Sequence, residues 1–155
     1  KDQLWRAAML GLANVIAEEE RLLAAAQDAT AIVQLRMAMR LFVQISWKHP
    51  ALGRIVALEG MAGGERLAWL NEHLLGARNR RLAALVRKAI ADGDLKPFAP
   101  EQVVVTLLEV NFGTDPDTPR GRAAHEELIL DGLFAGLLAN DTSVKKKTTT
   151  RRTRR

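Results

Sequence analysis

An amphipathic run from Glu65 to Asp92 constrains the fold of this chain more than any other feature of its sequence. Its apolar residues recur at three- and four-residue steps, which is typical of the buried side of a helix. They are Leu67, Leu70, Leu74, Leu82, Leu85, Val86, Ala89 and Ile90. Gly93 follows, and glycine suits the left-handed residue that often closes a helix. The run predicts one helix of roughly 40 Å, at about 1.5 Å per residue, on which shorter helices pack.

Five further segments have helical periodicity and are separated by residues that stop a helix. They are Lys1–Ala26, Ala29–Trp47, Ala51–Met61, Pro100 to about Thr114, and about Gly121 to Leu138. His49 precedes Pro50, which pushes it out of the α region and ends one helix. Three consecutive β-branched residues, Val103 to Val105, would also suit a strand, but a single strand has nothing to pair with. The sequence therefore predicts an all-α fold of about six helices.

Inside the long run, Gly76 should cost about 1 kcal/mol relative to alanine. A glycine kept at that cost indicates a bend in the helix or a close contact with another helix.

The chain has 155 residues, which fits one domain, and it contains no cysteine. Disulfides and thiolate metal sites are thereby excluded. Residues 145–155 carry seven basic groups, and the remaining chain has 16 basic and 18 acidic residues. The helical domain, residues 1–139, is therefore not a basic nucleic-acid-binding surface. Residues 140–155 form a basic tail that lacks apolar periodicity and is expected to be disordered.

No catalytic or metal-binding pattern stands out. The three histidines, His49, His73 and His125, have no second histidine three to five residues away, and the serines are Ser46 and Ser143 alone. A glycine-rich phosphate loop is also absent. We therefore predict neither an enzyme nor a metal or cofactor. No apolar run reaches the length of a membrane span and no secretory signal is visible, so a cytoplasmic location without membrane contact is expected.

Methionine and aromatic residues are concentrated in the first half of the chain: Met37, Met39, Phe42, Trp47, Met61 and Trp69. Such a cluster is usually core, but it also suits a mostly apolar ligand cavity with a few polar groups. The polar candidates are Glu59, Asn71, His73 and Asn111. Asn111 is the most informative, because an amide in an almost wholly apolar helix needs a partner.

Three stretches, taken in order, resemble one known family. They are Lys1–Trp5, then Phe42–Gly60 (FVQISWKHPALGRIVALEG), and then Arg80–Glu101 (RRLAALVRKAIADGDLK followed by PFAPE). Over about residues 1–139 the chain resembles the C-terminal, ligand-binding and dimerisation domain of TetR-family transcriptional regulators. The family's helix-turn-helix domain is absent from this chain.

The resemblance implies a homodimer in which the helices from Pro100 to Thr114 and from Gly121 to Leu138 form a four-helix bundle with their copies. The expected interface residues are Val103, Leu107, Val110, Leu128, Gly132, Leu133 and Gly136. A small apolar or amphipathic effector would bind among the preceding helices. Its expected contacts are Met39, Phe42, Trp47, Glu59, Trp69, His73 and Asn111.

The expected function is thus a ligand-responsive transcriptional regulator, with a repressor as the expected type. Effector binding would shift the first helix, which carries the DNA-binding heads, and operator DNA would be bound through those heads. The alternative is a helical protein-interaction module whose basic tail binds nucleic acid without sequence preference.

Overall fold

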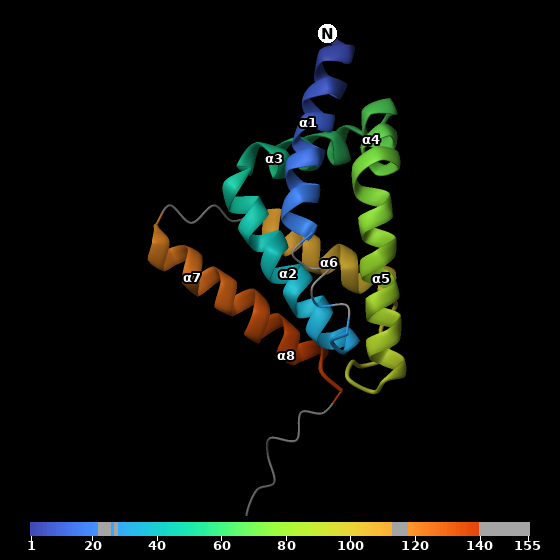
Figure 1. Cartoon of the computed structure of the whole chain (residues 1–155), viewed down its shortest axis with the longest axis vertical. Coiled ribbons are helices and arrows are strands. Elements are labelled where there is room, and N and C mark those ends of the chain that lie inside the picture. Colours follow the sequence, from blue (N-terminus) through green and yellow to red (C-terminus); the bar gives the residue numbers. More distant parts are fainter. Residues whose placement is uncertain (22–25, 27, 113–117, 140–155) are drawn as a thin grey trace, which may run out of the picture.

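Figure 1 shows a computed structural model of the chain, which describes residues 1–21, 26, 28–112 and 118–139. Side chains are described for these residues except 19, 109–112 and 119. Within this part the chain forms six continuous helices and no strand, apart from an isolated antiparallel bridge between Leu95 and Leu138. The predicted all-α fold of about six helices is confirmed.

Two of the six helices contain a π-helical segment. The helices are α1 (Asp2–Glu20), α2 (Ala31–Lys48), α3 (Pro50–Ala62), the long helix of α4 (Glu65–Leu70), η2 (Asn71–Leu75) and α5 (Gly76–Ala91), then α6 (Pro100–Phe112), and the C-terminal helix of α7 (Pro119–Glu127), η3 (Leu128–Leu133) and α8 (Phe134–Leu137). In a π-helical turn the backbone N–H bonds to the carbonyl five residues before it.

Three helix ends differ from the predicted ones by two residues or more, while the predicted end near Thr114 lies outside the described residues. The first helix ends at Glu20 instead of Ala26, and residues 22–25 of that prediction lie outside the described residues. Thr30, in extended conformation, is the N-cap of α2, so this helix begins two residues later than predicted. The C-terminal helix begins at Pro119, two residues earlier, because the Thr118 hydroxyl accepts a hydrogen bond from the Gly121 N–H at 3.0 Å. Proline also suits the first helical position.

Gly93 ends the long helix as predicted. It has a φ of 83°, and its N–H donates to the Ile90 carbonyl at 3.1 Å. The next N–H, of Asp94, reaches back to the Ala89 carbonyl at 2.9 Å. This pair of bonds is the Schellman motif, which satisfies carbonyls that would otherwise have no partner at the helix end.

Gly76 follows the π-helical segment η2, and its N–H donates to the Asn71 carbonyl. A Cβ atom on Gly76 would lie 2.4 Å from that oxygen. The close neighbours of Gly76 among the described residues thus belong to its own helix, whereas the predicted close contact was with another helix.

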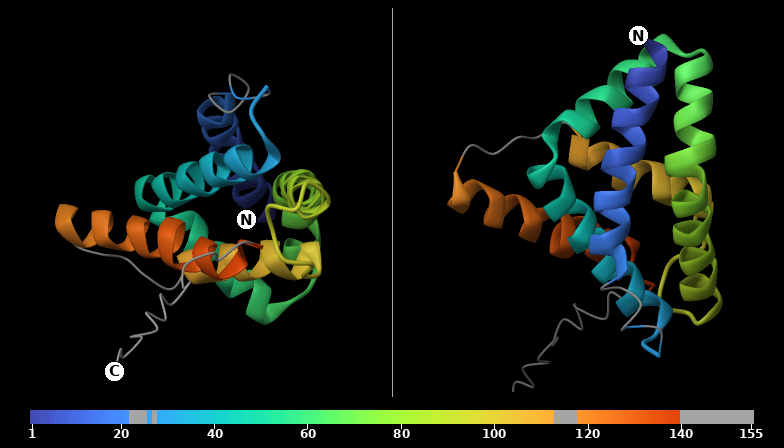
Figure 2. Two further views of the ribbon diagram at one scale, coloured as in Figure 1. Left: turned by 90° about the horizontal axis from the view of Figure 1, so that it is seen from below. Right: turned by 45° about the horizontal axis from the view of Figure 1, so that its top comes forward.

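A larger core lies where α2, α5, α6 and the C-terminal helix meet (Figure 2). Its buried members are Ala31, Leu35, Met39, Phe42, Leu82, Ala83, Val86, Ala89, Leu95, Val103, Val104, Leu107, Leu130 and Phe134. Backbone hydrogen bonds close this end, since the Lys96 N–H donates to the Leu137 carbonyl and the Ala139 N–H donates to the Asp94 carbonyl, each at 2.9 Å. We call this end of the molecule the base.

A smaller core joins α1, α2 and α3 through Ile16, Ile45 and Leu52. Above it lie the first turns of α1 and the corner where α3 meets α4, which we call the head end (Figure 1). The chain thus has a large apolar base and a less buried head end.

Candidate functional site

The predicted effector contacts are divided between three places in the structure. Met39 and Phe42 are buried in the larger core. Trp47 lies against His125, with ring centroids 6.3 Å apart. Trp69 and His73 are stacked on each other at the head end, with centroids 4.5 Å apart. The side chain of Asn111 lies outside the described residues.

Glu59 belongs to the head-end group, because Arg66 on α4 contacts it at 3.5 Å. The predicted residues Glu59, Trp69 and His73 are thus brought together, whereas Trp47 has a different aromatic neighbour. Sequence reasoning missed Trp5, whose ring meets Trp69 edge-on at 5.6 Å. Its signal was present in the sequence: Trp5 is one of three tryptophans in the chain, and it lies at the start of α1.

Within the described residues, four buried side-chain atoms have no hydrogen-bond partner: Trp47 Nε1, His49 Nε2, Asn79 Oδ1 and Arg78 Nε. Arg78 Nε nevertheless lies 2.6 Å from Glu20 Oε1, in an ion pair. Buried polar atoms in proteins nearly always have a partner, and each exception needs an explanation. Trp47, one of the expected effector contacts, and His49 lie at the corner between α2 and α3. A hydrogen-bonding group on a bound molecule would satisfy such atoms.

Among the described residues, His125 on α7 is the one polar residue that is buried, and its ring lies beside that of Trp47. Removal from water lowers the pKa of His125, because burial disfavours the protonated ring. The ring therefore adds a polar but uncharged surface next to Trp47 at neutral pH.

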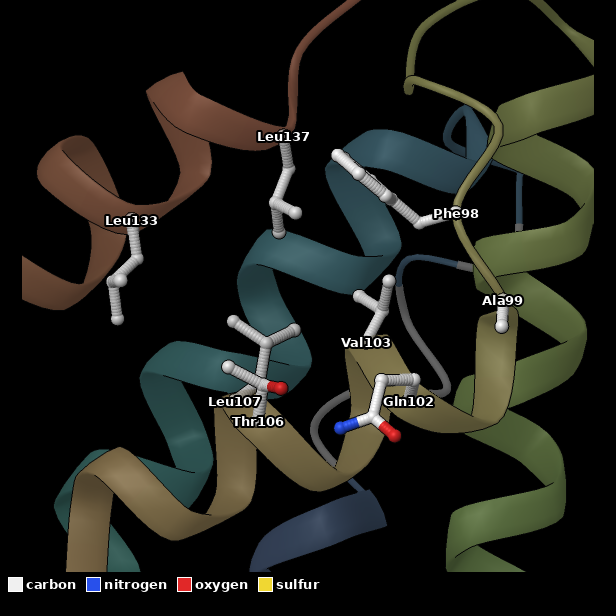
Figure 3. A pocket seen from close by; sticks show the side chains of 8 residues that line it. All are labelled: Phe98, Ala99, Gln102, Val103, Thr106, Leu107, Leu133 and Leu137. Carbon is white, nitrogen blue, oxygen red and sulfur yellow. The ribbon is translucent and has the colours of Figure 1, made fainter.

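An apolar hollow of about 280 Å³ lies between α6 and α8 on the outside of the molecule. Figure 3 shows the side chains that surround it: Phe98, Ala99, Gln102, Val103, Thr106, Leu107, Leu133 and Leu137. Six of these eight are apolar, and Gln102 and Thr106 supply the polar atoms. We call this feature the α6–α8 hollow.

The predicted interface residues divide into a buried and an exposed group around this hollow. Val103 and Leu107 belong to the larger core, so they form the floor of the hollow and expose little surface to a partner. Leu133 forms part of its wall. Leu128 is 62% exposed, and Gly132 and Gly136 are exposed on the same helix. The side chain of Val110 lies outside the described residues.

Within the described residues, no group of three or more His, Asp or Glu side chains could hold a metal ion. None of the described helices combines the length and the apolar character that a membrane crossing needs. No protein-family model matches the chain, and no curated protein sequence matches it.

Proposed function

We propose that this chain is the regulatory domain of a ligand-responsive transcriptional regulator that resembles the TetR family. In this proposal two copies pair through α6 and the C-terminal helix, and α1 carries a DNA-binding head. The order and lengths of the six helices support it, together with the three matching stretches of sequence. The observation that carries it is the α6–α8 hollow, because it lies on the two helices that the resemblance assigns to dimerisation.

Exposed apolar side chains occur at the hollow and on the two helices beside it. Phe98, which lines the hollow, is 47% exposed, Val105 on α6 is 43% exposed, and Leu128 on the C-terminal helix is 62% exposed. Large apolar patches on a soluble protein commonly mark an interaction site. A second copy would cover the same patch in a two-fold arrangement, so that one surface serves both partners. Gly136 would permit close approach, since nothing lies within 4 Å of the place where its Cβ would be.

The proposed effector is a small, mostly apolar molecule that carries a hydrogen-bonding group. The unsatisfied atoms Trp47 Nε1 and His49 Nε2 support this chemistry. The smaller core has three buried side chains among the described residues. Separating α1, α2 and α3 to open a cavity there would therefore require little free energy. Effector binding shifts the position of α1 only as far as the effector prefers one arrangement over the other.

Sedimentation velocity at micromolar concentration tests the dimer. The substitution Thr106→Arg places a charge in the hollow without removing a core side chain, because Thr106 is exposed. We expect the wild type to sediment as a dimer and T106R to weaken the dimer by at least tenfold, since a buried unpaired charge costs several kcal/mol. Ala84→Arg, on the exposed side of α5, is the matched control and should remain dimeric. A wild-type chain that sediments as a monomer would exclude the proposal.

The basic tail favours a second candidate, a helical interaction module that binds nucleic acid through residues 145–155. Deleting residues 143–155 separates the two. Under this candidate the deletion abolishes binding to a DNA duplex and leaves no other activity. Under the first proposal dimerisation and effector binding persist without the tail.

A further inference from the structure

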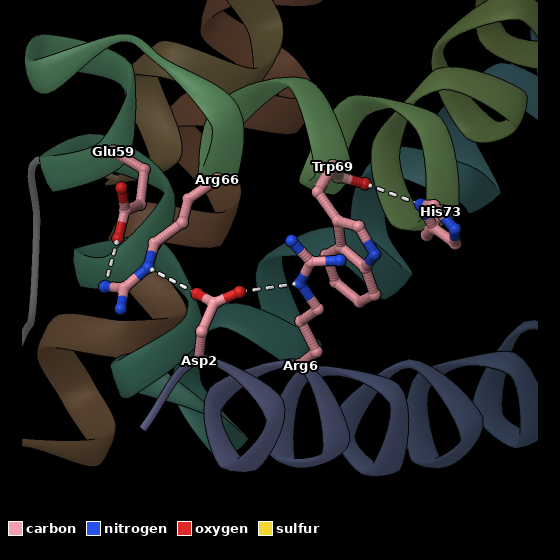
Figure 4. A network of polar contacts seen from close by, with 6 residues as sticks. All are labelled: Asp2, Arg6, Glu59, Arg66, Trp69 and His73. Carbon is pink, nitrogen blue, oxygen red and sulfur yellow. Dashed lines mark hydrogen bonds and ion pairs between the residues drawn. The ribbon is translucent and has the colours of Figure 1, made fainter.

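Arg66, at the start of α4, joins three helices at the head end (Figure 4). Its Nε lies 3.2 Å from Asp2 Oδ1 on α1, and its Nη1 lies 3.5 Å from Glu59 Oε1 on α3. The other carboxylate oxygen of Asp2 accepts from Arg6 Nε at 2.9 Å. One carboxylate of α1 is thus shared between an arginine of its own helix and an arginine of α4.

Aromatic rings lie directly beside these charges. The Arg66 guanidinium lies 5.0 Å from the centre of the Trp5 ring, and the Arg6 guanidinium lies 6.0 Å from that of Trp69. The Trp5 and Trp69 rings meet at 65°. On its other side Trp69 is stacked on His73, whose Nδ1 lies 3.0 Å from the Trp69 carbonyl. Two tryptophans and two arginines from α1 and α4 therefore form one contact.

The helix that carries this contact lies between two irregular pieces of backbone. Before α4 is the corner at Gly63 and Gly64, where both residues have positive φ. After α4 is the π-helical segment η2, which is closed by Gly76. Between them Leu70 is the buried residue of α4. α4 thus has one buried side chain and lies between two irregular pieces of backbone.

We propose that Arg66 acts as a latch, which holds the first two turns of α1 against α3 and α4. In this proposal α4 rotates relative to α5 at the η2 segment and carries Arg66 with it. When α4 turns, Arg66 leaves Asp2 and Trp5, and the start of α1 is released. The latch rests on exposed ion pairs, which salt screens. Its role as the link between an effector and the DNA-binding heads rests on the proposed function, but the latch itself can be tested without it.

Amide hydrogen exchange of the full chain measures how firmly α1 is held. We expect Arg66→Gln to raise the exchange of residues 3–9 by roughly two- to tenfold, the range that an exposed ion pair and a cation–π contact together supply. Exchange in α5 should not change. Arg81→Gln removes an equal charge from an exposed position of α5 and is the matched control. Equal exchange of residues 3–9 in R66Q and wild type, or an equal increase in α5, would overturn the proposal.

Spin labels measure the same release as a distance. The chain has no cysteine, so cysteines introduced at the exposed positions Ala8 on α1 and Ala84 on α5 would be the only ones. Labelled chain is diluted into unlabelled chain so that distances within one copy are measured. We expect a single narrow distance in the labelled parent and a broadened distribution after R66Q or Trp69→Leu. An unchanged distribution in both variants would exclude the latch, whereas a monomeric parent would exclude only the proposed dimer.

Discussion

At the base of the molecule many buried apolar side chains hold the helices together, whereas at the head end, besides buried Met9 on α1 and Leu70 on α4, exposed charges and aromatic rings join the helices. The larger core at the base has fourteen buried residues, and the smaller core has three. The base is also closed by backbone hydrogen bonds between residues 94–96 and 137–139. At the head end the contact between α1 and α4 depends on Arg66, whose side chain is 44% exposed.

The two kinds of contact differ in strength. A fully buried Leu or Phe side chain contributes about 1.5–3 kcal/mol, while an exposed ion pair contributes about 0–1 kcal/mol. Regions with few buried contacts open at a lower free energy than the whole protein. We therefore expect the base to set the global stability of the chain and the head end to open locally.

The largest expected effect is that of Phe134→Ala at the base. Phe134, the first residue of α8, is 0% exposed and belongs to the larger core with residues of α2, α5 and α6. Its removal should lower the free energy of unfolding by about 3–5 kcal/mol, measured by urea denaturation at one fixed protein concentration.

Ile16→Ala, at a site 1% exposed in the smaller core, should instead raise hydrogen exchange in α1 more than in α5. An I16A variant that loses as much global stability as F134A would show that the two cores are one cooperative unit.

Gly76→Ala tests the junction between the two regions. The added Cβ would lie 2.4 Å from the Asn71 carbonyl oxygen, so the π-helical segment must shift. A cost of about 1–3 kcal/mol is expected, as for other overpacked sites. Gly60→Ala in α3 is the matched control, because nothing lies within 4 Å of its added Cβ. That substitution should stabilise the chain by about 0.5–1 kcal/mol. Equal effects of G76A and G60A in urea denaturation would contradict the close contact at Gly76.

The fold could be predicted because each helix carries its own signals. Periodicity marked the six helices, and Pro50 and Gly93 marked ends that the structure confirms. The predicted start of the C-terminal helix, about Gly121, is two residues late, because threonine and proline are also common in loops. In fact Thr118 and Pro119 are a cap and a first helical position, which are also signals within the local sequence.

The head-end contact could not be predicted in the same way. Asp2 and Arg66 are 64 residues apart, and each alone is an ordinary charged residue on the surface of a helix. Met39 and Phe42 could not be assigned to core or cavity, because α2 is apolar on more than one side. Which neighbour covers each side depends on how the helices cross, and periodicity does not determine that.

Gly93→Ala tests the backbone at the base with a smaller expected effect. Gly93 has a φ of 83° and open space around its Cβ position, so the cost is conformational only. We expect the free energy of unfolding to fall by about 1 kcal/mol. Gly93→Asn should cost less, since asparagine tolerates this conformation better than alanine. Equal losses for G93A and G93N in urea denaturation would show that the Schellman closure does not need the left-handed conformation.

The smallest expected effect is a pH dependence of stability that arises from buried His125. Burial lowers the pKa of His125 in the folded chain below its usual value, so the unfolded chain binds a proton more readily. Stability therefore falls as the pH decreases through about 6.5, the pKa of an unperturbed histidine. We expect a lower urea midpoint at pH 5.5 than at pH 7.5, and a smaller difference after His125→Gln. An H125Q variant with the same midpoint difference as the wild type would show that burial of His125 does not limit stability in mild acid.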